Sequence, residues 1–337
     1  MSNFPKFLTV TIATLAATTT MIFAAEPVPA TAPTAPALPT WAYPQPTPGA
    51  PRAAPDDGSP KRVPDSEAAF TRAQITGRGA PVTDWHPDDH PPMPDIVSKP
   101  KSQLNPPLLA CGYCHLPTGG GRPENSSIAG LTPAYIKQQV LAFKNGDRPS
   151  SDPKRGPQTS MIAVAKATYE AELEQAAAYF TSLKPKSFIK VVEADTVPKT
   201  YTAGGILAKL PAGGTEPIGN RIIEVPEELE RFELRDSRTP YVAYVPPGSL
   251  KKGAELVNTG GNGKTVQCAA CHGPDLRGLL DFPRLAGRSP SYLMRQLWDM
   301  KNGTRTGGTT ILMKATVVNL TEEDMVAIVA YIASREP

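Results

Sequence analysis

Two stretches of the 337-residue chain repeat the same order of apolar and polar positions. In each stretch, a capping threonine or serine and a proline are followed by a segment with one apolar face, and this segment ends at Asn-Gly. That order of residues predicts helices over 133–144 and 290–301. Further segments of helical period predict helices over 169–183 and 322–334, with an opening helix over 249–258 in the second stretch only. The pattern therefore predicts a mainly helical fold made of two related units.

The stretch between the two helical units, 187–248, has a different pattern. Apolar and polar residues alternate in places over 188–192, 221–225 and 241–245, which is typical of short strands. We therefore expect a partly β, partly irregular insert, which packs across the edge of a bound group or forms a docking surface.

The first 25 residues have the pattern of an export signal. Lys6 precedes an uncharged run over 7–25 that ends in small residues. Six threonines dilute the hydrophobicity of this run, which favours cleavage near Ala25 over retention as a membrane anchor. In both cases the rest of the chain is exported, so we expect a periplasmic protein, associated with the membrane only if the segment stays uncleaved.

Prolines are concentrated directly after this signal. The chain has 39 prolines, and 11 of them lie within 26–60 among alanines and threonines. Such a composition favours an extended polyproline conformation rather than a packed core. We therefore expect a disordered, proline- and alanine-rich linker over 26–71.

These patterns divide the chain into five segments. They are a signal peptide or anchor over 1–25, a linker over 26–71, a first helical domain with an N-terminal extension over 72–186, an insert over 187–248 and a second helical domain over 249–337. Each domain is within the usual size range for a unit with its own core.

All four cysteines lie in two copies of one motif, CxxCH, at 111–115 and 268–272. This pattern is the attachment signature of c-type haem. Two thiols three positions apart on a helical turn each add to one haem vinyl group, and the next residue supplies a nitrogen to the iron. The residues expected to hold two covalent haem c groups are Cys111, Cys114, His115, Cys268, Cys271 and His272.

Other uses of paired cysteines explain the motif less well. The two pairs are too far apart in the sequence for a zinc finger or ribbon. A thioredoxin-like pair does not need a histidine next in line, and certainly not twice. Structural disulfides occur in exported proteins, but CxxC makes only a tight loop.

An offset of 157 residues relates the two motifs and continues downstream, where Gln139 matches Gln296 and Arg148 matches Arg305. Farther along, the first copy is five residues longer than the second, so the offset becomes 152, and it persists from there. Two sustained offsets indicate an internal duplication, so the chain contains two copies of one unit.

A haem iron with histidine on one side needs a sixth ligand for electron transfer. Met161 and Met313 match each other in the repeat and lie 46 and 41 residues after the motif histidines, in a predicted loop. We expect both to ligate iron, whereas core packing accounts for the methionines inside predicted helices. His86 and His90 are not repeated, and we expect a surface role for them, with adventitious metal binding as an alternative.

Each copy resembles a class I cytochrome c domain, and the pair resembles a bacterial tandem dihaem cytochrome c. The second copy carries the resemblance most fully, with CAACHG, PRLAG at 283–287, YLMRQLWDMKNGTR, Met313 and LTEEDMVAIVAYIAS. The resemblance implies that the Pro283 carbonyl orients the ring of His272.

The resemblance also implies that Gly253 and Tyr331 mark the crossing of the first and last helices. The first copy departs from the pattern in two ways. It has Ser126 at the position of Pro283, and it lacks an opening helix. We expect the segment 72–109, anchored by Trp85, to cover the first haem instead.

A periplasmic protein that carries single electrons through two haems, between a dehydrogenase or quinol-oxidising complex and a terminal acceptor, explains these features best. The haem units 98–186 and 249–337 carry net charges of +5 and +3. These charges are explained equally well by acidic redox partners and by an ordinary solvated surface of mixed charge. The overall charge of +3 is too small to indicate nucleic acid. The alternatives are a dihaem peroxidase or sulfur-compound dehydrogenase, and a cytochrome subunit of a larger dehydrogenase.

Overall fold

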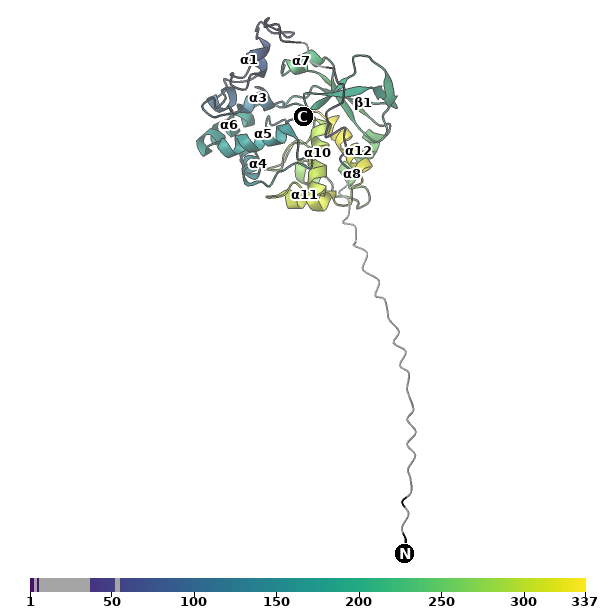
Figure 1. Cartoon of the computed structure of the whole chain (residues 1–337). Helices are drawn as coiled ribbons and strands as arrows, with labels where there is room; N and C mark the ends of the chain where they lie inside the picture. The colour runs from purple at the N-terminus through teal and green to yellow at the C-terminus, as the bar shows by residue number, and fades with distance from the viewer. Residues whose placement is uncertain (3–4, 6–36, 52–54) are drawn as a thin grey trace. The chain divides into compact units, whose positions relative to one another are not determined.

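The computed structural model describes residues 1–2, 5, 37–51 and 55–337 (Figure 1). The predicted export signal and the most proline-rich part of the predicted linker fall almost entirely outside these residues. Within the described residues, no helix combines the length and the hydropathy that a bilayer span requires.

The first copy contains the helix of the CxxCH motif and three longer helices that follow it. Their bounds are α3 (Cys111–His115), α4 (Pro133–Asn145), α5 (Gly156–Ala167) and α6 (Glu170–Ser182). Helix α4 begins where Thr132 accepts a hydrogen bond from the Tyr135 amide at 3.2 Å, and it ends at Gly146 with φ 84°, as the Asn-Gly signal predicts.

The second copy has the same elements preceded by an opening helix. The bounds are α8 (Ser249–Thr259), α9 (Ala269–His272), α10 (Pro290–Lys301), α11 (Thr310–Val317) and α12 (Glu322–Ala333). Helices α8 and α12 cross at Gly253, where any side chain would collide with the Ala327 carbonyl and with Tyr331. The helices predicted from the sequence match those of both copies to within one or two residues at each end.

An N-terminal extension replaces the missing opening helix in the first copy. It contains α1 (Arg72–Thr76), the 3₁₀ turn η1 (Pro87–Asp89) and α2 (Asp95–Ser98). Helix α2 packs on the attachment motif, because a side chain at Gly112 would come within 2.7 Å of the Val97 carbonyl oxygen. Trp85 anchors this extension, as predicted: its indole is buried and donates to the Leu234 carbonyl of the insert at 2.8 Å.

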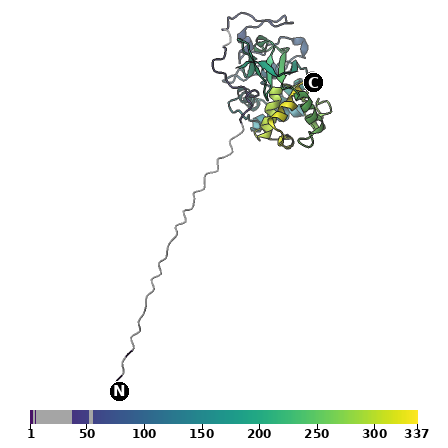
Figure 2. The ribbon, with the colours of Figure 1, turned by 90° about the vertical axis from the view of Figure 1, so that its right-hand side faces the viewer.

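The insert forms small sheets, as its alternating sequence predicts. Strand β7 (Tyr241–Val245) lies between β1 (Ile189–Glu193), to which it is parallel, and β6 (Ile223–Pro226), to which it is antiparallel. The remaining elements are β2 (Thr196–Pro198), β3 (Thr200–Ala203), β4 (Ile206–Lys209), β5 (Thr215–Pro217) and α7 (Leu229–Glu233). Figures 1 and 2 show the strands beside α12 of the second copy, which β1 and β7 contact.

The predicted linker is wrong for residues 38–43 and also for 61–70, where Lys61 and Phe70 form a β-bridge and Val63 is buried. Trp41, Ala42 and Tyr43 are buried in the same hydrophobic cluster as α10 and α12. The Tyr43 hydroxyl donates to Asp299 Oδ1 at 2.6 Å. Two aromatic side chains supply enough apolar area to fix this short stretch, which the surrounding proline content concealed. Residues 38–337 together form one compact unit.

Candidate functional site

Each CxxCH motif lies in the wall of its own cavity. Cys111, Cys114 and His115 line the first, and Cys268, Cys271 and His272 line the second. The cavities enclose about 1270 and 1230 Å³ of empty space, part of it open to solvent. No disulfide joins any of these four cysteines. Matching cavities at matching motifs indicate that both copies take the same large group.

Both motif histidines are oriented by a backbone carbonyl. His115 Nδ1 lies 2.8 Å from the Ser126 carbonyl oxygen, and His272 Nδ1 lies 2.8 Å from that of Pro283. Since the contact uses a main-chain atom, serine provides it as well as proline does. Burial lowers the pKa of both imidazoles. A ring that donates from Nδ1 keeps the Nε2 lone pair for a metal.

The two matched methionines line the same cavities but do not lie in loops. Met161 is in α5 and Met313 is in α11, and both are partly buried. The loop prediction was wrong because glycine and threonine before each methionine, with a proline as well before Met161, resemble loop sequence, whereas in the structure they lie at the start of a helix. Each cavity therefore has a histidine and a methionine among its lining residues.

The two cavities share a wall built from matched residues of the two copies. Arg148 donates to Gln139 and to Gln296, each at 2.8 Å. Arg305 donates to Gln296 at 2.9 Å and to Gln139 at 2.8 Å. Sequence reasoning identified these residues as repeated but gave them no role, although their duplication was the signal that they had one.

This shared wall is strongly positive. Burial alone would raise the pKa of the Tyr292 phenol, but Arg288, Arg148 and Arg305 lower it to about 7. Among the described residues, the buried Nε atoms of these three arginines lack hydrogen-bond partners. Buried cations with unused donors fit a ligand that carries carboxylates, as haem does with its propionates.

His86 is not a surface residue. Its side chain is buried, and its Nε2 lies 3.0 Å from Asp236 Oδ1 in the insert. His90 Nε2 lies 3.2 Å from Asp84 Oδ1. Neither histidine lines a motif cavity. Both belong to the polar contacts that hold the N-terminal extension, which an unrepeated sequence position does not reveal.

A family model described as Cytochrome c matches residues 250–336. Cytochrome c-554(548) of Halomonas halodenitrificans is 39% identical over 77 residues, which are 23% of this chain and 93% of that protein. The chain belongs to the cytochrome c family. It is similar to cytochrome c4 of Azotobacter vinelandii, with 26% identity over 227 residues, covering 66% of this chain and 82% of that protein.

A third similar protein is the thiosulfate dehydrogenase electron acceptor of Thiomonas intermedia, 25% identical over 233 residues, covering 68% of this chain and 80% of that protein. The two longer matches extend beyond either copy alone. This cytochrome c is a tandem dihaem protein that binds haem c covalently and carries electrons.

Proposed function

We propose that each copy holds its haem through both motif cysteines, with iron between a histidine and a methionine. The ligand pairs are His115 with Met161 and His272 with Met313. The observation that carries this proposal is that each pair lines a single cavity together with its own CxxCH cysteines. The two haem units correspond to residues 72–186 and 249–337.

The arginines of the shared wall complete the binding of the cofactor. Arg148 lines both cavities, and Arg305 lines the second. Their unused Nε donors would compensate the charge of propionates that lie away from water. Gln139 and Gln296 keep both guanidinium groups in position by accepting from each of them.

Haem iron supplies a reversible one-electron couple, whose potential a methionine ligand raises. The chain's own residues exclude water from this couple and keep its surroundings fixed. Phe180 and Leu173 line the first cavity, and Ile328 and Ile332 line the second, all four being buried. Rigid apolar walls limit the rearrangement that accompanies a change of charge.

We infer that the protein works in the periplasm with redox partner proteins. The export signal read from the sequence supports that location. A relative that is named as the electron acceptor of thiosulfate dehydrogenase supports a dehydrogenase as one electron donor. In the alternative role, in which this chain is itself the cytochrome subunit of such a dehydrogenase, the same two haem sites would carry the electrons.

The ligand assignment is tested by replacing each methionine with leucine, which conserves volume. Met161→Leu and Met313→Leu are each expected to remove half of the far-red absorption band that methionine–iron(III) bonds give. Met300→Leu is the matched control, since Met300 lines the second cavity from α10 but is assigned to packing. An intact band in either ligand variant, or its loss in the control, contradicts the assignment.

A further inference from the structure

Arg284 and Arg288 of the second copy extend across the boundary between the two copies. Arg284 Nη2 donates to the hydroxyl of Ser127 at 2.9 Å, and Arg288 Nη2 donates to the hydroxyl of Ser126 at 2.8 Å. Arg288 also donates to the carbonyl of Ser127. Two serines of the first copy therefore hold both guanidinium groups in place.

Arg288 lies between the two motif histidines. Ser126, whose hydroxyl it contacts, is also the residue whose carbonyl orients His115 at 2.8 Å. On its other side, Arg288 lines the second cavity together with His272. Its guanidinium lies 5.1 Å from the centre of the ring of Tyr292, which lines both cavities. Burial and, in addition, the charge of Arg288 lower the pKa of both imidazoles, so this charge acts on both haem sites.

The chain supplies no negative charge to compensate these two arginines. In the part of the chain that the structure describes, neither Arg284 nor Arg288 forms an ion pair, and the Nε of each lacks a hydrogen-bond partner. Both side chains are almost fully buried, at 4% and 3% exposed. Glu224 accepts from the neighbouring Ser289 at 2.7 Å, but burial raises the pKa of this carboxyl and favours its neutral form. The boundary therefore keeps a net positive charge.

The duplication does not account for this charge. The residue of the first copy that matches Arg288 at the offset of 157 is Leu131, a buried apolar side chain. The reverse contact is also missing, because Pro283 stands at the position that matches Ser126 and has no hydroxyl. Unlike the paired arginines of the shared wall, Arg288 thus comes from one copy only and serves at the boundary of both.

A buried cation without a carboxylate does not serve the stability of the fold. Removing a guanidinium group from water costs free energy that hydrogen bonds to neutral groups only partly offset. Burial, together with the charge of Arg288, lowers the pKa of Arg284 to about 9, which shows this cost. Leu131 shows that the repeated unit accepts an apolar side chain at the same position. Residues that are unfavourable for folding are concentrated at functional sites, so we look for the role of Arg288 in the cofactors.

We propose that Arg288 raises the reduction potential of both haems, as a fixed positive charge that the second copy places between them and the serines of the first copy hold in position. Reduction adds one electron to a haem, and a nearby cation stabilises the reduced form. In a buried site, salt and water screen this attraction only weakly. The proposal rests on the two haem sites proposed above and adds that one residue tunes both.

The test uses the full protein loaded with both haems and a spectroelectrochemical titration, which gives the two midpoint potentials. Arg288→Leu introduces the residue that the first copy has at the matched position. Both reduction equilibria are expected to shift about tenfold toward the oxidised form, which is about 59 mV for each one-electron couple. Arg288→Lys, titrated at about pH 6 so that the lysine stays protonated, keeps the charge and is expected to leave both equilibria within about twofold.

Two further variants separate the charge of Arg288 from other causes. Arg288→Gln is neutral but polar, so it admits water more easily than leucine does, and loss of the charge predicts the same shift in both variants. Arg277→Gln removes one positive charge from an exposed position of the same copy. Solvent screening is expected to limit its effect to about twofold. The far-red band of the oxidised protein is expected to persist in all four variants, since the iron ligands are unchanged.

The outcomes separate this proposal from the function on which it rests. Unchanged potentials in Arg288→Leu, a shift in Arg288→Gln alone, or a shift at one haem only overturn the tuning of both haems by this charge. An equal shift in Arg277→Gln also overturns it, because net charge is then the cause. An Arg288→Leu protein that binds fewer than two haems overturns it as well, because Arg288 then holds the cofactor. A wild-type titration without reversible one-electron steps overturns the proposed function instead.

Discussion

The two copies differ less in how they hold their haem than in what covers them. In both, a histidine is oriented by a carbonyl at 2.8 Å and a methionine lines the cavity from a helix. Around the first copy, the N-terminal extension and the insert cover the attachment motif, whereas the second copy exposes aliphatic side chains there. Duplication thus preserves the cofactor site while its surroundings diverge.

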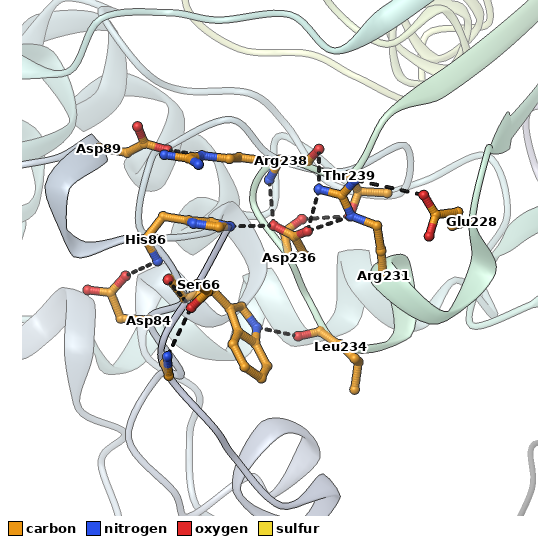
Figure 3. A network of polar contacts seen from close by, with 12 residues as sticks. Ser66, Asp84, His86, Asp89, Glu228, Arg231, Leu234, Asp236, Arg238 and Thr239 are labelled. Carbon is orange, nitrogen blue, oxygen red and sulfur yellow. Dashed lines mark hydrogen bonds and ion pairs between the residues drawn. The ribbon is translucent and has the colours of Figure 1, made fainter. Parts of the chain in front are cut away.

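The largest effect is expected from breaking the buried network in which Asp236 of the insert contacts Arg231 and also His86 of the N-terminal extension (Figure 3). Asp236→Ala leaves Arg231 and His86 without their buried partner, which costs about 3–5 kcal/mol of unfolding free energy. The first copy is expected to lose protection in hydrogen exchange before the second. Asp88→Ala removes an exposed acid nearby and is expected to change stability by less than about 0.5 kcal/mol. Equal loss of protection in both copies would contradict a cover specific to the first.

A matched pair of substitutions measures the difference in burial directly. Leu109→Ala removes a buried side chain and is expected to cost about 2–3 kcal/mol. Val266→Ala, at the same position of the second copy, is expected to cost less than about 1 kcal/mol because half of its side chain is already in water. Urea unfolding curves of the two variants test the comparison. Similar costs would show that the second copy is also covered.

Acid is expected to weaken the attachment of the extension to the insert. A hydrogen bond from Arg238 lowers the pKa of the Asp89 carboxyl to about 2. A depressed carboxyl pKa stabilises the fold above the unfolded value of about 3.9, and this contribution is lost as pH falls toward about 2. Asp89→Asn is therefore expected to cost up to about 1 kcal/mol at pH 6 and only a small part of that at pH 2. Urea unfolding at both pH values checks this. The control is Asp95→Asn, which breaks the exposed ion pair between Asp95 and Lys99.

The smallest effect has the opposite sign. Leu280→Asn replaces an exposed leucine in the left-handed region with a residue that adopts it more easily, and is expected to raise stability by about 0.5 kcal/mol. The side chain of Leu280 is 82% exposed and its backbone φ is 52°, so the substitution removes strain without removing a packed side chain. Urea unfolding measures this gain, and a loss of stability in the variant would contradict backbone strain at Leu280.

The sequence predicted helices α4, α6, α8, α10 and α12, the three strands of the central sheet and the cofactor, because each has a local signal: a cap, an alternation or a CxxCH spacing. It failed where tertiary contacts decide. The role of Trp41 and Tyr43 depends on a cluster more than 200 residues away in the sequence. The burial of His86 likewise depends on Asp236 in the insert, to which no spacing in the sequence points.

The reciprocal contacts of Arg148 and Arg305 with both glutamines have a consequence for how such a protein arises. In a symmetric dimer, residue i of one subunit contacts residue j of the other, and the reverse contact follows from the symmetry. Here both contacts occur within a single polypeptide, so the arrangement does not dissociate on dilution. A single gene also allows each half to mutate independently, which the identical subunits of a homodimer cannot do. The two halves of a formerly symmetric arrangement can therefore acquire different surfaces.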